Sequence, residues 1–168
     1  MKKFKLGLMI IAVIFSACLL AGCGNDDSKK EDNSPKNEEK TIATTLRDQF
    51  NEEIKNDKDL ESVANKLVEN EVIKVKVNVA TIGKKDYISG FTTEIKDFKS
   101  AVAIKPMIST IPFIAYIFEV ENAEKFAENL KSNADLRWNV CTEADDLEVS
   151  FVDNYVFIVM SPKSFDEE

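Results

Sequence analysis

The stretch LEVSFVDNYVFIVMS, residues 147–161, predicts a β-hairpin that ends the folded part of the chain. Two runs rich in β-branched and aromatic residues flank Asp153-Asn154, and both of these residues tolerate the positive φ of a two-residue primed turn. This turn places Val152 opposite Tyr155, and the pairing continues as Phe151 with Val156 and Val149 with Ile158. One face of the hairpin then carries Leu147, Val149, Phe151, Val156, Ile158 and Met160.

The two strands of this hairpin differ in the side chains on their second face. The first strand places Glu148 and Ser150 there, so we expect it at an edge of the sheet. The second strand is apolar on both faces, which is typical of an interior strand. FIAYIFEV, residues 113–120, is also apolar on both faces and predicts a central strand.

A helix is predicted between the central strand and the hairpin, over about residues 122–139. Apolar residues recur there at four-residue spacing, as Phe126, Leu130, Ala134 and Trp138. Asn122 is a suitable N-cap. We expect Trp138 to pack under the sheet, and a tryptophan platform for a ligand is the alternative.

Two shorter amphipathic helices are predicted at the start of the folded region. The first has an apolar stripe at Ile42, Leu46, Phe50 and Ile54, and the second covers residues 60–68, with Asp57 or Asp59 as its cap. Strict alternation predicts a half-buried strand over residues 72–82. Residues 87–95 form a second candidate strand, in which Gly90 marks a weak point or a bulge. Residues 100–104 are ambiguous.

Together these elements predict one α+β domain over residues 41–165. N-terminal helices precede a mostly antiparallel sheet of four to six strands, and the helix at about 122–139 is inserted before the C-terminal hairpin (147–152 and 155–161). We expect the helices to lie mainly on one face of the sheet.

The most unusual segment of this domain is PMISTIP, residues 106–112, which is apolar, uncharged and bounded by prolines. Proline at each end disfavours a helix or a central strand. The segment is either a loop folded onto the core or an exposed apolar patch for a partner or ligand. The candidate partner or ligand surface comprises Met107, Ile108, Ile111 and Trp138.

The first 22 residues have the features of a secretory signal peptide. Three early lysines precede an apolar run over residues 6–20, which is shorter than most membrane-spanning helices. Leu20, Ala21, Gly22 and Cys23 resemble the lipobox of bacterial lipoproteins. The resemblance implies cleavage before Cys23 and a diacylglycerol on its sulfur, and two acyl chains are enough for stable anchoring.

Residues 24–40 lack large apolar side chains and mix both charges, so residues 23–40 are expected to form a lipidated cysteine followed by a disordered tether. Residues 166–168 form an acidic tail. The predicted location is the extracytoplasmic face of the cell membrane. Cleavage removes three lysines and takes the formal net charge from −8 to about −11, which argues against nucleic acid as a partner. Cys141 is then left without a disulfide partner in the chain, and we expect it to be buried.

Several blocks resemble an uncharacterised family of small lipoproteins and secreted proteins from Gram-positive anaerobic bacteria. The resemblance covers the lipobox and residues 106–165, and is carried mainly by RWNVCTEAD (137–145) and VFIVMSP (156–162), with Gly90-Phe91. It implies the anchor and a single domain, and no activity. Similar proteins tend to have glycine at the position of Lys105.

The chain contains no histidine, P-loop, G-x-G-x-x-G, C-x-x-C or EF-hand loop. We therefore expect no catalytic residues, no metal and no cofactor other than the covalent diacylglycerol on Cys23; a weak Ca²⁺ site at Asp145-Asp146 is an alternative. The favoured function is a non-catalytic binding or assembly module of the cell envelope, with an unknown envelope protein as partner. The alternatives are a small-ligand-binding lipoprotein, with a pocket between sheet and helix near Trp138 and residues 106–112, and an enzyme that uses carboxylates or Cys141.

Overall fold

The structure is a computed structural model that describes residues 40–165. The predicted signal peptide, the predicted lipobox with Cys23, the predicted tether up to residue 39 and the acidic tail lie outside these residues.

A five-stranded antiparallel sheet forms the centre of the domain, with strand order β1-β2-β3-β5-β4. The strands are β1 Val77–Thr81, β2 Phe98–Pro106, β3 Ile114–Val120, β4 Asp146–Val152 and β5 Tyr155–Ser161. The helices are α1 Ile42–Asn56, α2 Leu60–Val68 and α3 Ala123–Asn133. The chain is therefore α+β, with helices before and between the strands and a C-terminal hairpin, as predicted.

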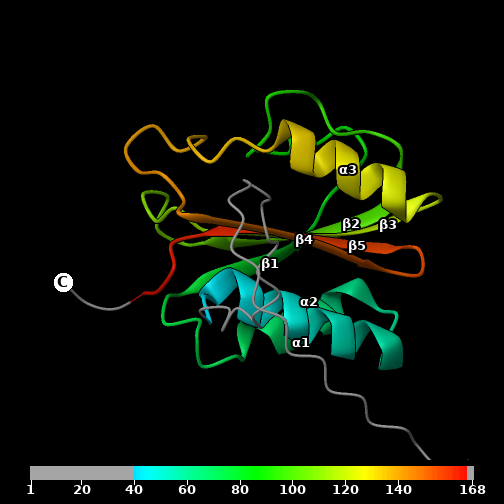
Figure 1. Ribbon diagram of the computed structural model, residues 1–168, viewed down its shortest axis with the longest axis horizontal. Helices are drawn as coiled ribbons and strands as arrows, with labels where there is room; N and C mark the ends of the chain where they lie inside the picture. The colour runs from blue at the N-terminus through cyan, green and yellow to red at the C-terminus, as the bar shows by residue number, and fades with distance from the viewer. Residues whose placement is uncertain (1–39, 166–168) are drawn as a thin grey trace, which may run out of the picture. The chain divides into compact units, whose positions relative to one another are not determined.

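The helices cover both faces of the sheet, which corrects the expectation that they lie mainly on one face. α1 and α2 pack on one face and α3 on the other (Figure 1). β3 explains this arrangement, because Tyr116 and Phe118 belong to the core on the α3 side while Ala115 and Ile117 belong to the core on the α1/α2 side. A strand that is apolar on both faces needs a cover on each.

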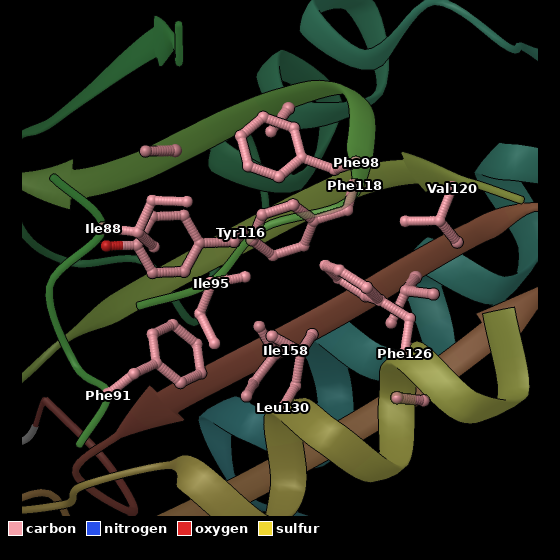
Figure 2. Close-up of a cluster of buried hydrophobic side chains, with 14 of the residues drawn as sticks. Ile88, Phe91, Ile95, Phe98, Tyr116, Phe118, Val120, Phe126, Leu130 and Ile158 are labelled. Carbon is pink, nitrogen blue, oxygen red and sulfur yellow. The ribbon is translucent and has the colours of Figure 1, made fainter. Parts of the chain in front are cut away.

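The core on the α3 side, here called the α3-face core, is rich in aromatic rings. The Phe118 ring lies between those of Phe98 and Phe126, with centroids 5.6 and 5.1 Å away (Figure 2). Edge-to-face contacts of this kind add about 0.5–1.5 kcal/mol per pair beyond the area they bury. They fix the start of α3 against β2 and β3.

The two N-terminal helices begin where the sequence predicts. Thr41 caps α1, with Oγ1 accepting a hydrogen bond from the Thr44 amide at 3.2 Å. Asp59 caps α2 by accepting from the Ser62 amide at 2.7 Å. The Phe50 ring stacks on Phe157 of β5 with centroids 5.0 Å apart, which attaches α1 to the centre of the sheet.

The hairpin has the predicted register. Val152 pairs with Tyr155, and the pairing continues through Val149 and Ile158. Asp153 alone of the two turn residues has a positive φ, of 53°. β5 is interior and β4 is at the edge, as expected. The edge position of β4 also explains why Phe151, which lies on the predicted core face, is exposed.

α3 is shorter than the predicted helix over residues 122–139. Asn122 caps it as expected, with its side chain accepting from the Lys125 amide at 3.0 Å, but the helix ends at Asn133. Ala134 is extended and pairs with Phe91, and the Asp135 amide donates to the Gly90 oxygen at 2.9 Å. Trp138 therefore lies beyond the helix, where it is partly buried against the α3-face core.

Two of the predicted strands differ from the structure. Only Val77–Thr81 of residues 72–82 is a strand, because its partner β2 ends at Pro106, opposite Val77. Residues 87–95 form no strand; they are a loop whose Ile88, Phe91 and Ile95 are buried over the sheet (Figure 2). Residues 100–104, which were ambiguous, lie within the nine-residue β2. No helix within residues 40–165 is long and apolar enough to cross a membrane.

Candidate functional site

The 106–112 segment is divided between core and solvent. Ile111 is partly buried against the α1/α2-side core, and Phe113, two residues later, is fully buried. Met107 and Ile108 are 69% and 63% exposed. Of the two alternatives, a loop folded onto the core is therefore wrong for Met107 and Ile108, and an exposed apolar patch describes these two residues.

A second loop is attached to this segment by hydrogen bonds. Asn139 Nδ2 donates to the backbone oxygen of Ser109, and Thr142 Oγ1 donates to that of Thr110, both at 2.7 Å. Val140, between these two donors in the chain, is 98% exposed. We call Met107, Ile108 and Val140 the loop tip. Sequence patterns do not identify Val140, because it is a single apolar residue in a polar loop.

Cys141 belongs to the second loop and is exposed, so the expectation that it is buried is wrong. It lines a shallow hollow with Arg137 and Glu143, whose Nε and Oε2 lie 3.2 Å apart. No other cysteine or base among residues 40–165 approaches its thiol with a hydrogen bond. Trp138 precedes this loop and packs inward, so it does not join the loop tip.

A hollow of about 660 Å³ lies between the sheet and α3, at the N-terminal end of the helix. Neither Trp138 nor any of residues 106–112 lines it, so it is not the pocket predicted from the sequence. Four lysines line this hollow, namely Lys84, Lys96, Lys99 and Lys125. We call the hollow the lysine groove. Its apolar lining consists of Phe98, Val120 and Phe126. The groove is hard to predict from the sequence, because its lysines come from three separate segments.

A second cationic group lies near the end of β2. Lys105 is partly buried, and Nζ donates to Ser89 Oγ at 3.3 Å. The Tyr116 hydroxyl donates to the Ser89 backbone oxygen at 2.9 Å. Burial lowers the pKa of Lys105 and raises that of Tyr116. Lys105 has no positive φ and lies within β2, so this backbone position does not require the glycine expected from the family resemblance.

Asp145 and Asp146 differ in their surroundings. Asp145 is exposed, whereas the Asp146 carboxylate accepts a hydrogen bond from Thr41 Oγ1 and joins β4 to the start of α1. Among the described residues, no group of three or more potential ligand side chains could hold a metal ion. The Asp145-Asp146 pair therefore has no third such ligand beside it in this part of the chain.

Comparison with known proteins identifies no relative: no family model, no curated protein and no solved structure matches the chain.

Proposed function

We propose that the chain is a lipid-anchored protein of the extracytoplasmic membrane face, whose domain binds a protein partner without catalysing a reaction. The lipobox sequence at Leu20–Cys23 supports the anchor. The loop tip is the single observation that carries the binding role. Three exposed apolar side chains lie on two loops, and side-chain hydrogen bonds hold these loops together.

Scattered exposed apolar residues are ordinary on protein surfaces, so exposure alone carries no argument. The loop tip differs because its residues come from loops about thirty positions apart in sequence, joined by two short hydrogen bonds. Fixing the loops before binding reduces the conformational entropy that association must remove. Burying such apolar surface contributes about 25 cal/mol per Å².

The charge of the chain favours a protein over a lipid surface as the occupant of the loop tip. The formal net charge is −8, so anionic headgroups repel the chain. A partner with an apolar pocket for the loop tip and a positive net charge would complement this acidic chain. Opposite charges across an interface mainly speed association, and salt weakens this effect.

The experiment places a photo-crosslinking amino acid at position 108 or 140 of the lipidated chain in intact cells. Position 87 is the control, because Tyr87 is 82% exposed on a different loop. We expect one and the same protein to be crosslinked from positions 108 and 140, and not from 87.

The purified partner then permits a quantitative measurement with the full chain. Ile108→Asp and Val140→Asp should each weaken binding about tenfold or more, as expected for central apolar contacts. Tyr87→Ser should leave the affinity unchanged, and higher salt should slow association. Near-ultraviolet circular dichroism checks that each variant is folded. Crosslinking only to lipid, or unchanged affinity of both aspartate variants, would reject the loop tip as a protein-binding site.

A further inference from the structure

The lysine groove gathers positive charge in a chain that is acidic overall. Lys96 pairs with Glu94 at 2.8 Å, and this hydrogen-bonded carboxylate raises the pKa of Lys96. Lys84, Lys99 and Lys125 have no carboxylate partner among residues 40–165. Two carboxylates, Asp97 and Glu121, also line the groove, but neither pairs with these lysines.

Several structural elements meet to form the groove. Lys84 comes from the turn after β1, whereas Lys96 and Lys99 flank the start of β2. Lys125 lies in the first turn of α3, so the positive end of that helix faces the same region. Like charges brought together in this way repel each other, and a bound anion relieves the repulsion.

The base of the groove is apolar. Phe98, Val120 and Phe126 line it, and their side chains gather between β2, β3 and the start of α3 (Figure 2). The volume of about 660 Å³ lies within the range of small-molecule sites. A ligand that matches this lining has an anionic group for the lysines and an apolar or flat part for the aromatic edges.

We propose that the lysine groove binds an organic phosphate. A phosphate monoester carries a charge of about −1.5 to −2 near neutral pH, which suits several surrounding cations better than a single carboxylate does. Lysine acts as a flexible point charge for phosphate. The phosphate belongs either to a free metabolite or to a lipid headgroup near the anchor. This site is separate from the loop tip, so either proposal can fail alone.

The test measures binding to the full chain in a neutral detergent by isothermal titration calorimetry. The soluble probes are inorganic phosphate and phenyl phosphate. The lipid probe is micelles doped with phosphatidic acid, which carries a phosphate monoester, compared with phosphatidylcholine. We expect saturable binding of phenyl phosphate, tighter than that of inorganic phosphate, because only the former reaches the apolar lining. Saturable binding of phosphatidic acid alone would assign the phosphate to a lipid headgroup.

The groove variant Lys84→Gln/Lys125→Gln should weaken binding about tenfold, since it removes two of the four lysine charges that line the groove. Lys85→Gln/Lys131→Gln is its matched control: it changes the same turn and the same helix, removes the same charge and avoids the groove. The control should bind like the wild type. Absence of saturable binding to any of the phosphate probes, or equal weakening by both double variants, would overturn the proposal.

Discussion

The ammonium group of Lys105 lies 5.6 Å from the centroid of the Tyr116 ring, at the end of β2. Its hydrogen-bond acceptor is Ser89 Oγ, and no carboxylate among residues 40–165 pairs with it. A cation–π contact offsets only part of the cost of removing a charge from water. Lys105 is therefore a half-buried cation whose charge is incompletely compensated.

Lys105→Met should stabilise the domain near neutral pH. Methionine keeps most of the apolar stem and its contact with the Tyr116 ring, and it removes the desolvated charge. We expect the free energy of unfolding to rise by roughly 0.5–1 kcal/mol at pH 7, from the balance of a lost cation–π contact and a removed desolvation cost. Urea unfolding of the wild type and the variant measures the difference.

The same substitution gives a pH dependence of defined sign. Burial lowers the pKa of Lys105 in the folded state below its ordinary value of 10.5. Between these two pKa values the unfolded state binds more protons, so the stability of the wild type rises with pH there. The advantage of Lys105→Met should therefore be largest below the folded pKa and shrink as pH approaches 10.5. Lys85→Met, at an exposed lysine, is the control; an equal trend in both variants would contradict this account.

Gly90→Ala should destabilise the domain. Gly90 has a φ of +93°, and a Cβ added there would lie 2.5 Å from Met160 Cε. The methionine end can shift, but the backbone strain stays, so we expect a loss of about 1–3 kcal/mol. Thermal unfolding measures it.

Gly83→Ala is the matched control for this prediction. Gly83 has no positive φ, and the nearest atom to an added Cβ is Asp86 Oδ2 at 3.1 Å, at the end of an exposed side chain that accepts a hydrogen bond from the Gly83 amide at 2.7 Å. It should cost a few tenths of a kcal/mol at most. If the two alanine variants are equally stable, the positive φ of Gly90 is not the source of the cost.

The parts of the fold that were predictable from sequence are those in which local pattern and packing agree. The hairpin register follows from Asp153-Asn154 and the alternation around it, and the pairing of Val149 with Ile158 confirms it. The apolar stripes at four-residue spacing likewise predict α1 and α2, and Asp59 is the N-cap of α2 as expected. β3 is interior because Phe118 and its neighbours make it apolar on both faces, and such a strand needs a cover on each.

The wrong predictions share a different cause, which is packing between segments distant in sequence. Ala134 continues the helical spacing of α3, yet pairing with Phe91 ends the helix first. The apolar residues of 87–95 resemble a strand, but they cover the α3-face core as a loop. The loop tip at Val140 and the lysine groove are formed by segments that meet only in the folded chain. Composition and local patterns do not predict which segments meet.

Cys141 should react rapidly with a thiol reagent in the folded domain, because its side chain is exposed. With Cys18 and Cys23 replaced by serine, we expect the native protein to be alkylated within about tenfold of the rate of the urea-unfolded protein, since access is the main factor for an exposed thiol. Mass spectrometry follows the modification. Cys141→Ser in the same background should give no adduct. A native rate slower by several orders of magnitude would mean that the second loop covers the thiol.

Cys23→Ala should abolish lipid attachment, because it removes the sulfur that we propose carries the diacylglycerol. In cells fed a labelled fatty acid, the wild type should incorporate the label. The variant should incorporate none and should not give the mature anchored form. Cys18→Ala is the matched control, since it removes a thiol from the same signal region but not from the Leu20–Cys23 motif. It should be labelled and retained in membranes like the wild type. Two acyl chains provide stable anchoring, so loss of both chains should also release processed protein from the membrane fraction. Label retained in Cys23→Ala, or lost in Cys18→Ala instead, would refute Cys23 as the site of lipidation.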